Sequence, residues 1–308
     1  IERTAEPPTH ELIKEYAEMG YLGINIPEAL GGLGQTSLDA LIVLEEFGRI
    51  SSAIAFPVFE SCTGPVKAIE HFGTEALKQR IVPAVCSGDM VVAIAMSEPN
   101  AGSALTDLTT RAEIGDSSIR LNGMKRWCSG GGHADGYLVY CRMSDVPGAK
   151  GIGAVFVEKG TEGMTFGEQE ALMGFRGVPS SDIFFDNVEI PLDNLVVGAG
   201  GFGKLMQAFD LERCGNATMA MAQAAGALAE VVEYVQERKQ FGKPIVDFQA
   251  VQLRLAEMQM QVDASRLLIH RAISNAESGM PSIQESSMAK CFAKEISRAV
   301  AGNAMQRM

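Results

Sequence analysis

The spacing of hydrophobic positions changes twice along the chain, and each change marks a new block of structure. Up to about residue 88, apolar residues recur at the interval of amphipathic helices. Helix-capping and helix-ending residues bracket three such segments: Thr9 to Gly20, Thr36 or Ser37 to Gly48, and Thr74 towards Pro83. The first block therefore predicts an N-terminal α-helical domain over residues 1–88.

The second block, residues 89–199, changes to short runs of β-branched and aromatic residues. These runs lie at residues 91–95, 137–141, 154–157 and 182–185, and Gly, Asp, Asn and Pro separate them. Their spacing favours a compact antiparallel β-barrel or sandwich over alternating βαβ units. We expect this block to form a middle β domain.

The third block, residues 200–308, is helical again. The stretch from Phe202 to Gln240 lacks proline and is rich in Ala, Met, Leu, Glu and Gln, which favours one long helix. Three residues mark the helices that follow: Asp247 as the cap of a second long helix through about Ser278, and Ser282 with Glu285 as a capping box for a third. Such helices pack as a bundle. The last pattern runs to residue 308 without a stop signal, so we expect the bundle to be incomplete.

Composition narrows the function classes. The 308 residues carry a net charge of −12, which argues against nucleic acid as the main partner. The six cysteines show no CxxC spacing, so we expect reduced thiols without a disulfide framework, a zinc site or another metal. No apolar run reaches transmembrane length, and no signal peptide is visible. The pattern indicates an α+β multidomain protein without stable membrane insertion, cytoplasmic or, in a eukaryote, in the mitochondrial matrix.

Two segments carry the candidate chemistry. Residues 94–103 end an apolar strand in a turn of Pro, Asn and Gly, and such turns expose backbone N–H groups and small hydroxyls. Residues 125–131 supply the only tryptophan of the chain beside a serine and a glycine triplet. An aromatic wall, hydroxyl donors and room for close backbone approach suit a planar heterocycle with a phosphate tail. The same features also occur in unrelated sheets, so these residues alone leave a purely structural role open.

Further motifs agree with a known family in order and spacing. They are Ile26-Pro27-Glu28 with Gly31-Gly32-Leu33-Gly34, Ser97-Glu98-Pro99-Asn100-Ala101-Gly102-Ser103, Leu121-Asn122-Gly123-Met124-Lys125-Arg126-Trp127, Asp186-Asn187-Val188-Glu189-Ile190-Pro191, Glu237-Arg238-Lys239-Gln240-Phe241-Gly242, and Gln249 with Ala256-Glu257-Met258. With these motifs the chain resembles the acyl-CoA dehydrogenases, which are FAD-dependent flavoproteins, along essentially its whole length. The resemblance implies three domains, residues 1–88, 89–199 and 200–308, and an FAD cofactor.

The resemblance also assigns cofactor contacts. Those in the middle block are Ile94, Met96, Ser97, Ser103, Trp127, Cys128 and Ser129, and those that reach the FAD of a neighbouring subunit are Arg238, Lys239, Gln240, Phe241, Phe248 and Gln249, with Gln306 at the adenine end. Trp127 would stack on the isoalloxazine, and Ser97 and Ser129 would approach flavin N5. The alternative for Arg238 is a solvated charge at a helix end, and the alternative for Phe241 is a core residue.

The implied reaction converts an acyl-CoA thioester to trans-2-enoyl-CoA. A carboxylate takes the α-proton and flavin N5 takes the β-hydride. Most members carry the catalytic Glu in a segment beyond Met308, but isovaleryl and long-chain types use the position at which Glu212 stands. The implied substrate contacts are Ser103, Asp210, Leu211, Glu212 and Arg213, and Phe56, Phe59 and Glu60 would lie near the acyl tail. Two alternatives remain for Glu212: a surface carboxylate paired with a nearby cation, or a polar residue of the pocket wall with the catalytic base elsewhere.

One segment departs from the family. Arg176-Gly177-Val178-Pro179-Ser180 stands where the family usually reads Arg-x-Ser-x-Thr, and it is similar to the sulfinate-eliminating acyl-CoA desulfinases. That branch carries a glutamine where Glu212 stands, so Glu212 counts against it. A lyase of the same fold, an acyl-CoA oxidase and a non-enzymatic helical scaffold are the other interpretations. The resemblance implies an electron-transfer flavoprotein as acceptor and a homotetramer, but not the acyl chain length.

Overall fold

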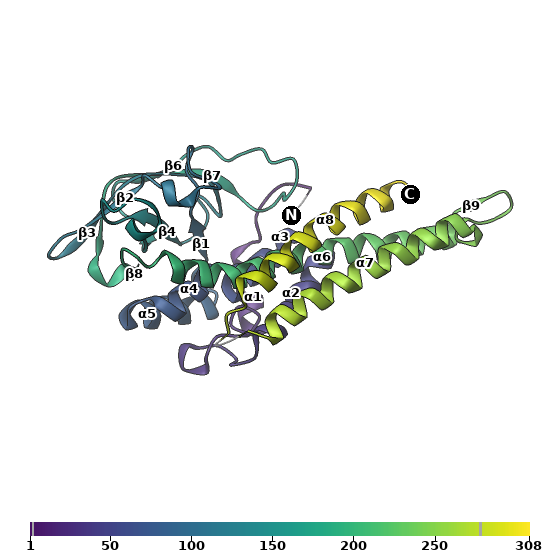
Figure 1. Ribbon diagram of the computed structural model, residues 1–308, viewed down its shortest axis with the longest axis horizontal. Helices are drawn as coiled ribbons and strands as arrows, with labels where there is room; N and C mark the ends of the chain where they lie inside the picture. The colour runs from purple at the N-terminus through teal and green to yellow at the C-terminus, as the bar shows by residue number, and fades with distance from the viewer. Residues whose placement is uncertain (2, 277–278) are drawn as a thin grey trace. The chain divides into compact units, whose positions relative to one another are not determined.

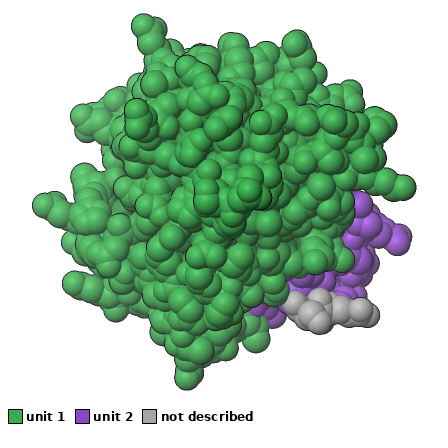
Figure 2. All heavy atoms as spheres, turned by 90° about the vertical axis from the view of Figure 1, so that its left-hand side faces the viewer, with its two compact units in different colours: residues 1–36, 56–209 green, residues 37–55, 210–308 purple. Residues whose placement is uncertain are grey.

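The computed structural model describes residues 1, 3–276 and 279–308. The chain forms two compact units (Figure 2), one of residues 1–36 and 56–209 and one of residues 37–55 and 210–308. The chain passes between the units at three points: at the start of α2 (Ser37–Ile50), within α3 (Ser52–Cys62) and within α6 (Phe202–Glu237). This division differs from the three expected domains, whose boundaries stay a prediction.

Three α-helices of the described residues lie wholly in the first unit: α1 (His10–Glu18), α4 (Pro65–Phe72) and α5 (Glu75–Cys86). Two of them, α1 and α5, begin where the capping residues predict. The Thr9 side chain accepts a hydrogen bond from the Leu12 amide and Thr74 one from the Leu77 amide, which satisfies free N–H groups of each first turn. These two starts are confirmed, whereas α5 continues through Pro83 for three residues more than expected.

The first unit also holds an eight-stranded sheet (Figure 1) in the order β6-β7-β3-β2-β4-β5-β8, with β1 beside β4. The strands are β1 (Val92–Ala95), β2 (Arg111–Ile114), β3 (Ser118–Ser129), β4 (Gly136–Arg142), β5 (Ile152–Glu158), β6 (Met164–Phe166), β7 (Ser180–Pro191) and β8 (Leu195–Val197). Most pairs are antiparallel, as predicted. The pairs of β4 with β1 and β2 are parallel, because the chain returns to β4 only after the β2–β3 hairpin.

The second unit is made of helices. It contains α2 (Ser37–Ile50), most of α6, α7 (Gln249–Ser274), α8 (Ile283–Met305) and the hairpin β9 (Lys239–Gln240) with β10 (Lys243–Pro244). Arg266 on α7 forms an ion pair with the buried Glu45 on α2, Nη2 to Oε1 2.7 Å. α2 runs past Gly48, because this glycine serves close packing: a Cβ there would lie 2.9 Å from the Ala222 Cβ. The expected end at Gly48 is therefore wrong.

Three other helix ends differ from expectation. α6 stops at Glu237 rather than Gln240, and α8 stops at Met305 rather than at the last residue. Asp247 lies in a 3₁₀ turn (Ile245–Asp247), so the residue before α7 is Phe248 and the predicted Asp247 cap is wrong. The predicted end near Ser278 falls outside the described residues, and α7 ends at Ser274.

Only one of the two hydrogen bonds of the predicted capping box of α8 is present in the described part of the chain. The Ser282 hydroxyl accepts from the Glu285 amide at 3.2 Å, but the Glu285 carboxylate contacts Arg271 and Asn275. All six cysteines are free thiols, and only Cys291 is exposed. None of the helices in the described residues combines the length with the apolar character that a membrane crossing requires.

Candidate active site

The turn after β1 is closed by two backbone hydrogen bonds. The Glu98 amide donates to the Ala101 carbonyl at 2.9 Å, and the Ala101 amide donates back at 3.1 Å. Pro99, Asn100 and Gly102 are exposed, and no atom of the described residues lies within 4 Å of a Cβ built on Gly102. The turn therefore presents its backbone to solvent, together with the exposed Ser103.

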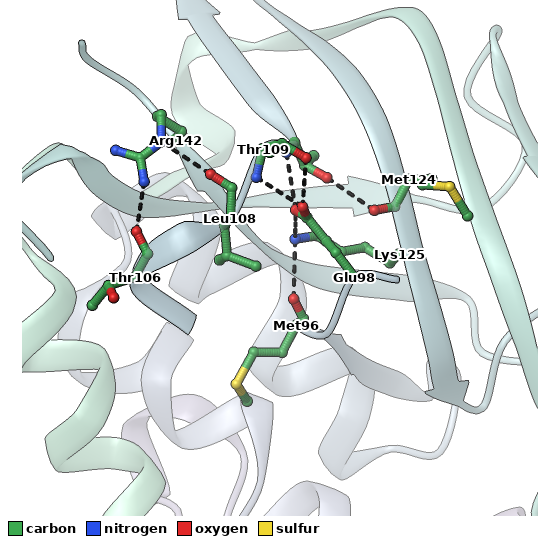
Figure 3. A network of polar contacts seen from close by, with 9 residues as sticks. Met96, Glu98, Thr106, Leu108, Thr109, Met124, Lys125 and Arg142 are labelled. Atoms are coloured by element: carbon green, nitrogen blue, oxygen red, sulfur yellow. Dashed lines mark hydrogen bonds and ion pairs between the residues drawn. The ribbon is translucent and has the colours of Figure 1, made fainter. Parts of the chain in front are cut away.

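A buried ion pair between Glu98 and Lys125 holds this turn in place (Figure 3). The Lys125 ammonium donates to Glu98 Oε1 at 2.8 Å and to the Met96 carbonyl at 3.1 Å, and its side chain is fully buried. Glu98 also accepts from the Thr109 amide and hydroxyl, both at 2.7 Å, and from the Thr110 amide at 2.9 Å. β3 and the loop before β2 thus hold the end of β1 in one position.

The protonation of this pair follows from its partners. Burial raises the pKa of Glu98, but the charge of Lys125 and the donated hydrogen bonds outweigh burial and bring the pKa to about 2. Burial lowers the pKa of the Lys125 ammonium, and Glu98 opposes that shift. The role of Lys125 escaped the sequence prediction, although a lysine between the apolar positions of a strand is a signal that it needs a buried partner.

A β-bulge exposes the tryptophan. Lys125 faces Ile183 and Cys128 faces Ser181, so three steps along β3 oppose two along β7. Trp127 lies in this bulge with φ 59° and is 53% exposed, whereas the residues on both sides of the bulge are buried. In a regular strand Trp127 and Lys125 would share a face. The bulge therefore turns the indole outward.

Two hydrogen bonds bring the predicted cofactor residues of β1 and β3 together. The Arg126 amide donates to the Ser97 carbonyl at 2.8 Å, and the Cys128 thiol donates to the Ile94 carbonyl at 3.1 Å. Ile94, Met96, Ser97 and Ser129 are half-buried and Trp127 is exposed. The side chain of Cys128 is buried, which leaves only its backbone for a ligand.

The glycine triplet has a different role from the expected one. A Cβ on Gly131 would lie 2.5 Å from the Ser181 hydroxyl, and one on Gly130 would lie 3.0 Å from the Ala93 Cβ. The Gly132 amide donates to the Tyr137 hydroxyl at 3.0 Å. These glycines are therefore explained by packing inside the first unit and not by approach of a ligand.

The candidate base lies on α6 in the second unit. Glu212 is 8% exposed, so the alternative of a solvated surface carboxylate is wrong. Burial raises its pKa to about 8, and the charges of Lys290 and Arg213 oppose that rise only in part. Asp210 pairs with Arg213 and accepts from the Ser286 hydroxyl at 3.1 Å, which links α6 to α8. Leu211, predicted as a substrate contact, is fully buried.

The predicted contacts to another subunit are exposed around the β9–β10 hairpin. Phe241 is 91% exposed with φ 52°, so the alternative of a core residue is wrong for it. Its ring meets that of the half-buried Phe248 edge to face at 6.1 Å, and the Lys243 ammonium lies 4.4 Å from the Phe248 centroid. Arg238, Lys239, Gln240, Gln249 and Gln306 are exposed as well. Their assignment to a neighbouring subunit stays a prediction.

Residues 176–179 of the segment that differs from the family pattern line a cavity of about 380 Å³ in the first unit. Arg176, Gly177, Val178 and Pro179 form part of its wall, and Ala5 and His133 another part. Phe175, also in the wall, meets Phe56 edge to face at 5.4 Å, and Phe56 stacks on the buried Phe59. The proline substitution thus falls at the surface of a cavity.

Three family models match the chain. The acyl-CoA dehydrogenase N-terminal domain matches residues 1–89, the middle domain residues 93–188 and the C-terminal domain residues 199–308. Among curated relatives, the 3-sulfinopropanoyl-CoA desulfinase of Cupriavidus necator is 38% identical over 93% of this chain and 74% of its own. The caffeyl-CoA reductase-Etf complex subunit CarC of Acetobacterium woodii is 33% identical over 99% of this chain and 81% of its own.

Solved structures share the fold. Butyryl-CoA dehydrogenase from Megasphaera elsdenii superposes with a TM-score of 0.94 at 32% identity, covering 99% of this chain and 81% of its own. The FAD complex of PigA superposes with a TM-score of 0.91 at 25% identity, covering 99% and 82%. The chain therefore belongs to the acyl-CoA dehydrogenase family of FAD-dependent oxidoreductases.

Proposed function

We propose that this chain dehydrogenates an acyl-CoA thioester between its α and β carbons, giving trans-2-enoyl-CoA, with Glu212 as the base. The observation that carries the proposal is the burial of Glu212, which raises its pKa from 4.5 to about 8. Carboxylates tuned upward in this way are typical of general acid–base catalysis near neutral pH.

The residues on the first unit fit FAD. The exposed indole of Trp127 offers a flat aromatic wall, and the half-buried Ser97, just after β1, and Ser129, at the end of β3, offer hydroxyl donors. The open turn at Gly102 and Ser103 suits the pyrophosphate, because small residues let the backbone approach an anion closely. When bound, FAD supplies the atom that accepts the hydride from the β carbon.

Glu212 provides the proton acceptor. An ordinary carboxylate is too weakly basic to take a proton from the α carbon, and burial makes Glu212 a stronger base. The α-proton passes to a carboxylate oxygen of the ionised form of Glu212, which predominates above the pKa of about 8. Hydrogen-bond donors on the thioester carbonyl stabilise the negative charge that develops there. We propose that Asp210, Leu211 and Arg213 form the substrate-contact segment, with the Asp210–Arg213 pair and Ser286 fixing this turn of α6.

We also propose an electron-transfer flavoprotein as the acceptor and a homotetramer as the assembly. The similarity to a subunit of an Etf complex supports the acceptor. The exposed aromatic ring of Phe241 supports the assembly, because a solvated phenyl ring on a hairpin is typical of a contact surface. Phe248, Gln249 and Gln306 would complete the contact with the FAD of the neighbouring subunit.

A desulfinase is the second candidate. The 38% identity to the desulfinase of Cupriavidus necator and the Gly177-Val178-Pro179 segment favour it. Glu212 argues against it, because the desulfinase branch carries a glutamine at the position of Glu212. An oxidase would differ from both by reacting rapidly with oxygen.

The test is an anaerobic titration of the FAD-loaded protein with a panel of acyl-CoAs and with 3-sulfinopropanoyl-CoA. We expect an acyl-CoA to bleach the flavin absorbance, and Glu212→Gln to slow bleaching by about 10³-fold while FAD stays bound. Glu230→Gln is the matched control, an exposed carboxylate on the same helix. Sulfite release without bleaching would establish the desulfinase instead, and unchanged bleaching by Glu212→Gln would exclude Glu212 as the base.

A further inference from the structure

One face of the single tryptophan is already occupied. The guanidinium carbon of Arg126 lies 4.6 Å from the centroid of the Trp127 indole. This is the geometry of a cation–π contact, in which the positive charge lies over the ring. A planar ligand that stacks on Trp127 therefore has only the opposite face available.

The guanidinium is held by a neighbouring strand. Asp182 on β7 lies opposite the bulge, with its Oδ2 3.6 Å from Arg126 Nη1. The Asp182 side chain is 18% exposed, and its Oδ1 is buried without a hydrogen-bond partner in the part of the chain that the structure describes. A partly buried carboxylate with one unsatisfied oxygen favours a fixed cation beside it. Asp182 thus keeps the charge of Arg126 over the ring.

The backbone of Arg126 is fixed as well. Its amide donates to the Ser97 carbonyl at 2.8 Å, and Trp127 follows at φ 59° in the bulge. The side chains of Arg126 and Trp127 are adjacent in sequence, and a regular strand would send them to opposite faces of the sheet. The bulge is what allows the two side chains to stack.

We propose that Arg126, held by Asp182, is a positioning residue for Trp127 that selects one indole face for the cofactor and places a fixed positive charge behind it. The proposal rests on the proposed function for the identity of the ligand. A positive charge near a bound flavin favours the reduced form, which is the more negative one. Arg126 therefore raises the reduction potential of the flavin through Trp127.

Two measurements on the variants Arg126→Met and Arg126→Lys test the proposal. The first is acrylamide quenching of the Trp127 fluorescence in the full chain without FAD, which reports on this residue alone because the chain has one tryptophan. We expect Arg126→Met to increase quenching by about twofold, because both indole faces become accessible. Arg126→Lys keeps the charge but not the planar cover, so its quenching lies close to that of Arg126→Met.

The second is the midpoint potential of the bound flavin. We expect Arg126→Met to shift the balance towards oxidised flavin by about tenfold, which is about 30 mV for a two-electron couple. Arg126→Lys restores most of this shift, and Asp182→Asn gives a smaller shift in the same direction. A purely structural role would lower thermal stability without moving the potential.

The matched control is Arg120→Met. Arg120 lies on the same strand and forms an ion pair with Glu189 on β7 at 3.0 Å, remote from the bulge. Quenching and potential that change equally in Arg126→Met and Arg120→Met would overturn the proposal. Failure of the parent chain to bind FAD would refute the proposed function and the potential shift, while the quenching experiment would still decide whether Arg126 covers Trp127.

Discussion

Two glutamates in this chain are buried to nearly the same degree but differ in acidity. Glu98 in the first unit is 6% exposed, and its pKa falls to about 2. Glu212 in the second unit is 8% exposed, and its pKa rises to about 8. Burial raises the pKa of both carboxyls. The difference therefore comes from the groups that surround each carboxylate.

Glu98 lies among donors that stabilise its charge. Lys125 contacts it at 2.8 Å, and Thr109 and Thr110 donate three further hydrogen bonds. Lys290 and Arg213 lower the pKa of Glu212, but their combined effect is smaller than that of burial. A carboxylate satisfied like Glu98 is a structural anchor at neutral pH, and one like Glu212 is able to exchange a proton.

The largest effect on stability is expected when Glu98 loses Lys125, its ion-pair partner. Lys125→Met leaves Glu98 buried beside Thr109 and Thr110 without its ion-pair partner, and we expect the free energy of unfolding to fall by about 3–5 kcal/mol. The measurement is urea unfolding of the full chain at neutral pH. The Met96 carbonyl also loses its donor, so the end of β1 should lose protection in hydrogen exchange.

The double variant Glu98→Gln with Lys125→Met separates charge from packing. Because it removes both charges, it should recover part of the stability lost in Lys125→Met. If the double variant is as unstable as the sum of the two single variants, the ion pair is not what holds the turn. Glu98 could then no longer be contrasted with Glu212 as a carboxylate held in place by an ion pair.

An intermediate effect is expected from pH, with opposite signs at the two sites. Folded Glu212 holds its proton up to about pH 8 while the unfolded chain releases it near 4.5, so its contribution to stability is lost as pH rises between these values. Glu98 contributes above its unfolded pKa of 4.5, and this contribution is lost as pH falls towards 2. From pH 6 to pH 8, Glu212→Gln should lose about 2 kcal/mol less stability than the parent. Equal slopes would mean that Glu212 is ionised in the folded state throughout this range.

The sequence alone predicted the order of the elements well, because periodicity and caps are local signals. Thr9, Thr74 and Ser282 cap helices as expected. The misses came from tertiary packing: Gly48 continues a helix because α6 approaches it closely, and Asp247 enters a 3₁₀ turn before α7. The parallel pairing of β1 with β4 was not predictable either, since it joins strands separated by two others in sequence.

The sequence predicted the residues of the candidate site, but not the contacts that position them. Trp127 and Ser97 were identified from residue type and resemblance, and the structure joins their strands through the Arg126 amide. The bulge that exposes Trp127 left no signal in the sequence, because it depends on the register between β3 and β7. The raised pKa of Glu212 likewise depends on helix packing, which the local sequence around it does not encode.

The smallest effect on stability is expected from removing one hydrogen bond to Glu98, the one from the Thr109 hydroxyl. The Thr109 hydroxyl donates to Glu98 Oε2 at 2.7 Å, while its amide donates to the same atom at 2.7 Å and stays in place on substitution. Thr109→Val should therefore cost only about 1 kcal/mol in urea unfolding and raise the pH at which acid unfolds the protein. Thr106→Val in the same loop is the control, because its hydroxyl contacts the exposed Asp107. A shift in the acid midpoint confined to Thr109→Val would show that the acidity of Glu98 is the sum of separate donors, whereas equal effects in both variants would assign it to Lys125 and the backbone amides alone.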